Sequence, residues 1–161
     1  MASLGDGRSP PPVLVHPPVL VLAVLAAAFV IDRMVGWRLA LGPLEAIRLP
    51  LGALLLVAGA TVMALAVQGF LRGGTNVPTY RPAVALVTAG IYARTRNPMY
   101  LGGLVLLLGL ALVLASPALL ALWPVTALVL HYGVVRREEP YLERLFGEPY
   151  RAYRSRVRRW M

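Results

Sequence analysis

Four long apolar stretches constrain the fold of this chain more than any other feature of its sequence. They cover residues 13–35, 49–71, 98–115 and 117–135, and Asp32 and Arg33 are the acidic and basic residues that interrupt them. A helix needs about 20 apolar residues to cross a bilayer, whose interior offers no water to an open backbone. The predicted fold class is therefore all-α, an integral membrane helical bundle with about four transmembrane helices.

The first stretch is predicted to be a retained span. It is too long for the core of a signal peptide and lacks a convincing small-residue cleavage site. Pro17 and Pro18 suit the first turn of its helix. At its other end, Asp32 and Arg33 are expected to pair with each other or to reach the membrane interface, and they need no catalytic explanation.

The composition agrees with a membrane protein and excludes several kinds of site. Apolar residues make up 58% of the chain and charged residues 14%, against about 25% charged in a typical soluble domain. The absence of cysteine excludes disulfides, thiolate metal sites and cysteine nucleophiles. The two histidines, His16 and His131, lie too far apart in sequence to indicate a metal cluster, so no metal is expected.

The net charge of +9 comes from sixteen arginines, and their positions predict an orientation. They lie in short segments beside the apolar stretches and no nucleic-acid fold motif is present, so no nucleic-acid partner is expected. With four spans, Arg33, Arg38 and Arg48 fall on one side of the membrane and the other thirteen on the opposite side. The positive-inside rule then predicts cytoplasmic N- and C-termini. An arginine-only basic composition indicates a bacterial source, which predicts the inner membrane.

The chain is predicted to have three parts. Residues 1–12 contain three consecutive prolines and cannot bury enough surface to become ordered, so they are expected to form a flexible tail. Residues 13–71 form a two-span membrane scaffold, joined by a polar connection at residues 36–49. Residues 72–161 form the functional core, which consists of a loop, a helical hairpin and a C-terminal cap.

Glycines and prolines give further detail within the second and third parts. Gly52, Gly59 and Ala60 are small residues that allow a neighbouring helix to approach the second span closely. Residues 72–82, at the start of the loop that follows, have paired glycines and two prolines, so a regular helix is not predicted there. Residues 83–89 are apolar but too short to span, and they could lie at the interface or fold under the helices.

From Glu138 onward the chain is predicted to form a cytosolic amphipathic helical tail. Apolar and aromatic residues recur at helical spacing up to Phe146, Gly147 is a stop, and Pro149 begins a second short helix. A basic, aromatic tail of this kind commonly lies against anionic headgroups, so membrane lipids are expected partners.

The polar ends of the last two apolar stretches carry an ordered set of motifs. The first is Gly90-x-Tyr92-x-x-x-Arg96-Asn97-Pro98-x-Tyr100-x-Gly102, the second is Glu138-Glu139, and the third is Phe146-Gly147-x-x-Tyr150-x-x-Tyr153. This order resembles the isoprenylcysteine carboxyl methyltransferase family and, more broadly, the membrane methyltransferases that include the phospholipid N-methyltransferases. The resemblance covers roughly residues 70–158, and it implies that residues 72–161 are a methyltransferase core.

The resemblance also implies a cofactor, S-adenosylmethionine, held on the cytosolic side between the last two spans, the preceding loop and the C-terminal segment. Residues 84–87 match a stretch whose backbone contacts the cofactor, and Glu138 matches the cofactor-contacting carboxylate better than Glu139 does. The full set implied to bind the cofactor is Val84, Ala85, Leu86, Val87, Tyr92, Arg96, Asn97, Pro98, Met99, Tyr100, Glu138 and Glu139.

No catalytic residue is assigned, and Arg96, Asn97 and Glu138 are candidates for positioning the reactants. Asn97 stands where the eukaryotic members carry histidine; it keeps a donor and an acceptor but does not titrate near neutral pH, so a general-base role at this position is lost. The family's substrate-side arginine falls on Val134. Arg136 and Arg137, close by, are the candidates for substrate binding.

The same residues suit this cofactor on chemical grounds. Glu138 or Glu139 could accept hydrogen bonds from its ribose or ammonium, and Arg96 could pair with its carboxylate. Tyr92 and Tyr100 could stack on the adenine or lie against the sulfonium. Transfer of an activated methyl group needs neither a metal nor a covalent intermediate, so alignment and exclusion of water would dominate. His131 is a candidate base, although a lone histidine in a span is more often a packing residue.

The predicted function is therefore S-adenosylmethionine-dependent transfer of a methyl group to a lipophilic acceptor, with carboxylate O-methylation as in the isoprenylcysteine family. Two alternatives stay open. One is N-methylation of a phospholipid or another lipid amine. The other is a non-enzymatic membrane protein that binds lipid or a partner through its basic tail. The acceptor and the oligomeric state are not predicted.

Overall fold

A computed structural model describes residues 13–40, 42–76 and 82–161, without the side chain of Leu44. The expected tail at residues 1–12, with Arg8, and the loop residue Arg81 lie outside the described residues. Helices account for all the regular structure in the described part of the chain. In order, they are α1 Pro17–Val35, η1 Gly42–Leu44, α2 Glu45–Arg72, η2 Gly90–Ala93, α3 Pro98–Val113, α4 Pro117–Val129, η3 Leu130–Val135, α5 Arg136–Phe146 and α6 Glu148–Arg156.

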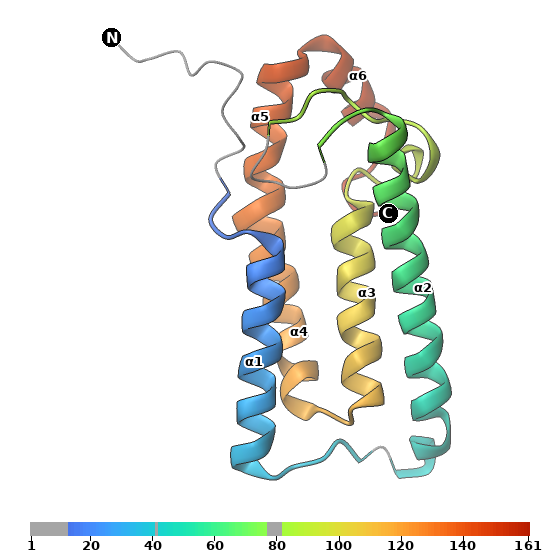
Figure 1. Cartoon of the computed structure of the whole chain (residues 1–161), viewed down its shortest axis with the longest axis vertical. Helices are drawn as coiled ribbons and strands as arrows, with labels where there is room; N and C mark the ends of the chain where they lie inside the picture. The colour runs from blue at the N-terminus through green and yellow to red at the C-terminus, as the bar shows by residue number, and fades with distance from the viewer. Residues whose placement is uncertain (1–12, 41, 77–81) are drawn as a thin grey trace.

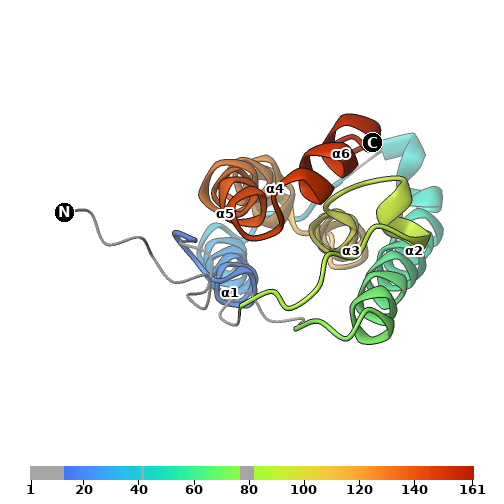
Figure 2. The ribbon, with the colours of Figure 1, turned by 90° about the horizontal axis from the view of Figure 1, so that it is seen from above.

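The long helices form a bundle of two pairs. α1 packs along α4, α2 packs along α3, and α3 joins the pairs by packing on α4 (Figures 1 and 2). Among the described residues, α1, α2 and the continuous helix Pro117–Phe146 are long and apolar enough to cross a membrane, and α3 is apolar but shorter. The predicted class, an all-α helical membrane bundle, is confirmed.

The start of α2 corrects the predicted connection. Residues 36–49 were expected to be a polar link, but the helix already begins at Glu45 and contains Pro50 within its first turns. Glu45 in the first turn favours the helix N-terminus, and it pairs with Arg48 at 2.6 Å. Arg48 also donates to the carbonyls of Leu112 and Val113, so it satisfies the C-terminal end of α3.

The third helix is shorter than predicted at its C-terminal end. The apolar stretch runs to residue 115, but α3 ends at Val113 and Ala115 adopts a left-handed φ of 50°. Its 16 residues give a length of about 24 Å, against a hydrocarbon core of about 30 Å. Ser116 then caps α4 by accepting from the Leu119 N–H at 3.0 Å, and Pro117 occupies its first turn.

Glycines bring the backbones of α2 and α3 into contact. A Cβ atom added at Gly59 would lie 2.8 Å from the Gly102 carbonyl oxygen, and one at Gly109 would lie 2.9 Å from that of Gly52. The predicted close approach at Gly52 and Gly59 is confirmed. Ala60 is exposed, so it takes no part in this contact.

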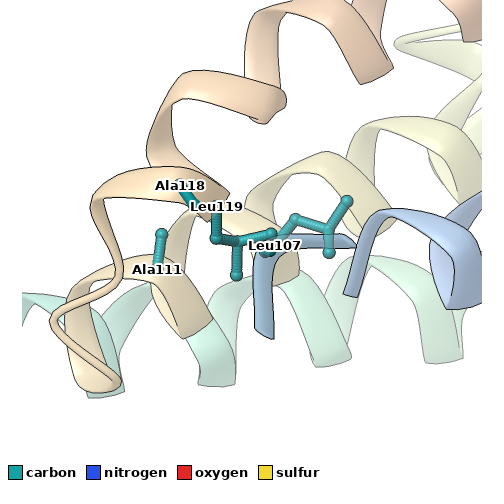
Figure 3. Packing of buried hydrophobic residues seen from close by; sticks show 5 residues of the cluster. Leu107, Ala111, Ala118 and Leu119 are labelled. Atoms are coloured by element: carbon teal, nitrogen blue, oxygen red, sulfur yellow. The ribbon is translucent and has the colours of Figure 1, made fainter. Parts of the chain in front are cut away.

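At the end of the bundle where α1 finishes and α4 begins, the two helices are joined by an interaction that the sequence did not indicate. Asp32 at the end of α1 accepts from the Ser116 hydroxyl and, at 3.1 Å, from the Ala118 N–H at the start of α4. Arg33 instead lies over the Phe29 ring. Just beside this cap, Leu107 and Ala111 of α3 pack against Ala118 and Leu119 of α4 (Figure 3). Asp32 therefore joins α1 to α4.

At the other end, which we call the polar end, α2 finishes, α3 begins, and α5 and α6 lie above the bundle (Figure 1). α4 continues through the π-helical segment η3 into α5 without a break. Gly147, with φ of 58°, ends α5, and α6 follows with a proline in its first turn, as predicted. The apolar part of this long helix ends at Val135, and α5 extends beyond it.

Candidate functional site

A pocket opens at the polar end between α2, α3, α5, α6 and the loop before η2. The empty space within it is about 960 Å³, which includes open solvent at its mouth. The residues that line it are Phe70, Thr75, Asn76, Ala83, Ala85, Leu86, Val87, Tyr92, Arg96, Asn97, Pro98, Met99, Tyr100, Val135, Glu138, Glu139, Tyr141, Leu142, Tyr150 and Tyr153.

Helical periodicity explains which side of α5 faces the pocket. Val135, Glu138, Glu139 and Leu142 follow the i, i+3, i+4, i+7 spacing of one helical face, and all four line the pocket. Arg136 and Arg137 fall between these positions. Both are exposed, and neither lines the pocket.

The two neighbouring carboxylates have different partners. Glu138 accepts a hydrogen bond of 2.7 Å from the Tyr100 hydroxyl, which links α5 to the first turn of α3. Glu139 lies between two guanidinium groups and accepts from Arg159 through both of its oxygens at 2.7 Å. Its Oε1 also lies 3.1 Å from Nη1 of Arg96.

One nitrogen of the Arg96 guanidinium is bound by neighbouring side chains, whereas another has no partner among the described residues. Its side chain is 10% exposed and that of Glu139 is 12% exposed, so this ion pair is largely shielded from water. Nη1 also donates to the Tyr150 hydroxyl at 3.2 Å. The buried Nε–H has no hydrogen-bond partner among the described residues. A buried donor without a partner is costly, so this group is suited to a ligand acceptor.

Tyr92 supplies a second unused buried donor. Its ring stacks on Phe70 with centroids 5.1 Å apart, and its carbonyl accepts from the Tyr153 hydroxyl at 2.7 Å. Gly69 leaves room for the ring, since a Cβ atom there would lie 3.1 Å from it. The Tyr92 hydroxyl has no partner in the described part of the chain. Burial raises its pKa, so the hydroxyl keeps its proton.

Asn97 is engaged by the C-terminal segment. Its Nδ2 donates to the Arg159 carbonyl at 2.9 Å, and its N–H donates to Oγ1 of Thr95 at 3.3 Å. The side chain thus fixes the residue that precedes α3.

The loop segment that lines one side of the pocket is held in place by two residues that the motifs did not indicate. Oγ1 of Thr75 accepts from the N–H groups of Val84 and Ala85 at 3.0 and 3.2 Å, and the Tyr141 hydroxyl accepts from the Ala83 N–H. These bonds hold the extended segment that contains Ala85, Leu86 and Val87 against the pocket.

The structure brings together all the predicted cofactor-binding residues except Val84. Val84 is 65% exposed and does not line the pocket. The predicted substrate residues Arg136 and Arg137 also lie outside the lining. Among the residues that sequence reasoning missed, Tyr150 and Tyr153 were part of a recognised motif, whereas Phe70, Thr75 and Asn76 carried no signal.

His131 is a packing residue, as the more common alternative predicted. Its Nδ1 accepts from the Trp160 indole N–H at 3.1 Å, and its ring lies against those of Tyr132 and Trp160. It does not line the pocket.

The pocket can bind a polar molecule that carries both charges. It offers carboxylates, a guanidinium with a free N–H and several aromatic faces. Within the described residues, no group of three or more potential metal ligands exists. The side chains that line the pocket offer hydrogen-bond donors, acceptors and aromatic faces to a ligand.

Comparisons with known proteins identify the family. A curated Haemophilus influenzae protein, described as an uncharacterized protein, is 40% identical over 63 residues, which are 39% of this chain and 100% of that protein. None of the solved structures matches the chain. Residues 47–149, more than half of the chain, match the family described as phospholipid methyltransferase. The chain therefore belongs to the phospholipid methyltransferase family.

Proposed function

We propose that this protein uses S-adenosylmethionine to methylate a lipophilic acceptor at the membrane surface, with residues 72–161 as the methyltransferase core. Methyltransferases of this family generally use S-adenosylmethionine. The observation that carries the proposal is the pocket at the polar end, which brings Arg96 and Tyr100, at the start of α3, together with Glu138 of α5.

The unused donors of the pocket fit this cofactor. S-adenosylmethionine carries a carboxylate, ribose oxygens and adenine nitrogens, all of which accept hydrogen bonds. The free Nε–H of Arg96 and the free hydroxyl of Tyr92 would donate to such acceptors. Glu138 would accept from the ribose hydroxyls or the ammonium, and the Tyr100 hydroxyl orients it. When bound, the cofactor supplies a methyl group on a positively charged sulfur.

The side chains then act by orientation rather than by covalent chemistry. The rings of Tyr92 and Tyr100 would lie against the positive charge of the cofactor. Leu86, Met99 and Leu142 line the pocket with apolar groups that exclude water. The acceptor would arrive from the bilayer, and Arg136 and Arg137, both exposed at the polar end, would contact an anionic group of it.

Two kinds of atom are candidates for accepting the methyl group, a carboxylate oxygen and an amine nitrogen. Carboxylate O-methylation follows from the resemblance to the isoprenylcysteine family, and a carboxylate is already ionised at neutral pH. The match to the phospholipid methyltransferase family favours N-methylation of a lipid amine. An amine must lose a proton before or during transfer, and the described pocket offers Glu138 as the carboxylate without an arginine partner.

We further propose that the polar end faces the cytoplasm of a bacterial inner membrane. The described arginines Arg72, Arg94 and Arg96 and all those from Arg136 onward belong to this end, and Arg33, Arg38 and Arg48 belong to the other. This distribution follows the positive-inside rule.

The test is transfer of a labelled methyl group from S-adenosylmethionine to lipid in membranes that contain the protein. We expect label in the lipid extract with wild type and with Glu148→Gln, whose carboxylate is 75% exposed, and none with Glu138→Gln. Label released by mild base identifies a methyl ester, and base-stable label identifies a methylamine. Absence of label with folded wild-type protein would contradict the proposal and favour a non-enzymatic role of the basic tail.

A further inference from the structure

The last five residues of the chain turn back onto the candidate site. α6 ends at Arg156, and Val157 adopts an extended conformation with φ of −119° and ψ of 128°. Residues 157–161, which we call the C-terminal strap, then run beside the segment that leads into α3. This path is not part of the helical cap that the sequence predicted.

The backbone of the strap holds the segment before α3. The Arg158 carbonyl accepts from the Arg96 N–H at 3.0 Å. The Arg159 carbonyl accepts from Nδ2 of Asn97 at 2.9 Å and from the Thr95 hydroxyl at 3.2 Å. Three consecutive residues before α3, two of which line the pocket, are therefore bound by two consecutive carbonyls.

The side chain of Arg159 is linked to the same segment through Glu139 of α5. Its Nε and Nη2 donate to the two carboxylate oxygens of Glu139, both at 2.7 Å. This paired geometry fixes the plane of the carboxylate, and a lysine could not reproduce it. Glu139 in turn pairs with Arg96 at 3.1 Å. The charge and hydrogen bonds of Glu139 raise the pKa of Arg159, so its guanidinium stays charged.

Trp160 anchors the strap to the membrane-spanning part of the bundle. Its indole N–H donates to Nδ1 of His131 at 3.1 Å, and its ring packs against the apolar cluster that contains Leu104, Leu130 and Val134. The strap is thus attached to η3 at one end and continuous with α6 at the other. Arg159 lies between these two attachments.

We propose that the C-terminal strap positions Arg96 in the cofactor site, with Arg159 as the positioning residue, and this inference rests on the proposed function. Glu139 and the Tyr150 hydroxyl together occupy Nη1 of Arg96, and the strap holds its backbone. The group left without a partner in the described structure is the Nε–H. Arg159 acts through Glu139 and Asn97 and touches no ligand itself.

The experiment measures binding of S-adenosylhomocysteine to the full-length protein in detergent micelles by calorimetry. We expect Arg159→Gln to weaken binding on the order of tenfold, because Glu139 loses its paired donors and no longer fixes Arg96. Arg159→Lys should weaken binding less than Arg159→Gln does, because it keeps the positive charge but not the pair of donors that binds both carboxylate oxygens. Arg156→Gln is the matched control, since it removes the same charge from an exposed position three residues earlier. It should bind as wild type does.

A double-mutant cycle separates positioning from general stability. In a Glu139→Gln background, Arg159→Gln should weaken binding much less than it does in wild type, because the route through Glu139 is already lost. Thermal unfolding of each variant checks that it is folded. Trp160→Phe removes the bond to His131 and keeps an aromatic side chain. It should also weaken binding, and it is the variant to measure if Arg159→Gln does not fold.

The outcomes distinguish the two proposals. Failure of folded wild type to bind S-adenosylhomocysteine would overturn the cofactor site itself. Wild-type binding that persists unchanged in folded Arg159→Gln, or equal losses in Arg159→Gln and Arg156→Gln, would overturn the strap alone.

Discussion

At the scale of single residues, the adjacent carboxylates Glu138 and Glu139 separate into two roles. The sequence predicted an acidic pair in the site but left open which member would meet the cofactor. In the structure Glu139 forms ion pairs with Arg96 and Arg159, whereas Glu138 accepts a hydrogen bond from the Tyr100 hydroxyl. This difference depends on Arg159, which is 20 residues away in sequence and belongs to no motif. Local pattern therefore identified the pair and could not assign it.

Tyr92 gives a residue-scale prediction in which stability and binding change in opposite directions. Its buried hydroxyl has no partner among the described residues, and an unsatisfied buried group costs about 1–3 kcal/mol. We expect Tyr92→Phe to raise the unfolding temperature of the ligand-free protein. The same change should weaken S-adenosylhomocysteine binding, because it removes a donor to the ligand.

Tyr153→Phe is the matched control for this prediction. Its hydroxyl donates to the Tyr92 carbonyl at 2.7 Å, so its removal should lower the unfolding temperature. Thermal unfolding in detergent and calorimetry measure both variants. A lower unfolding temperature for Tyr92→Phe, or unchanged ligand affinity, would contradict the role given to the Tyr92 hydroxyl.

At the scale of elements, helix positions followed from apolar length, while their ends and contacts depended on neighbours. Pro98 and Pro117 predicted the starts of α3 and α4 correctly. The early start of α2 depends on Glu45 and Arg48, and Arg48 reaches the carbonyls at the end of α3. Such tertiary contacts leave no periodic signal in the sequence. The same applies to the C-terminal strap.

Because glycines bring α2 and α3 into contact, the loss of stability caused by a larger side chain should depend strongly on its position in α2. Gly59→Leu would place a side chain against the backbone of Gly102, where a Cβ atom already lies 2.8 Å from the carbonyl oxygen. We expect a loss of about 1–3 kcal/mol, because the two helices must separate. Ala60→Leu, one residue further on an exposed surface, should change the stability little. Denaturation in mixed detergent micelles measures both, and equal effects would contradict the contact.

The cap formed by Asp32 predicts a smaller effect at the other end of the bundle. Asp32→Ala removes the acceptor for the Ser116 hydroxyl and the Ala118 N–H, and loss of a helix cap costs about 1 kcal/mol. Asp32→Asn keeps one oxygen acceptor and should cost less. Thermal unfolding followed by tryptophan fluorescence compares them. Wild-type stability of Asp32→Ala would show that the cap does not stabilise the α1–α4 pair.

At the scale of the whole molecule, the polar and charged side chains of the candidate site lie at one end of the bundle, and the surface along its length is apolar. The end of α2, the start of α3, α5 and α6 all meet at the polar end (Figure 1). The sequence predicted this gathering because two spans in succession return the chain to the same side. It could not predict that Thr75, in the loop, and Phe70, in the last turns of α2, would line the pocket.

The proposed orientation can be tested with single cysteines, because the natural chain contains none. We expect Ser155→Cys, at the polar end, to react with a membrane-impermeant maleimide in inside-out vesicles and not in intact spheroplasts. Arg38→Cys, in the loop after α1, should show the opposite pattern. Reversed labelling of both variants would place the polar end outside the cytoplasm.

The central claim is that the pocket between α3, α5 and the preceding loop holds the methyl donor. The most direct measurement is an experimental structure of the full-length protein in lipid with S-adenosylhomocysteine. We expect ligand density within hydrogen-bond distance of Glu138, Nε of Arg96 and the Tyr92 hydroxyl. Ligand bound elsewhere on the molecule, or an empty pocket at saturating ligand, would contradict it.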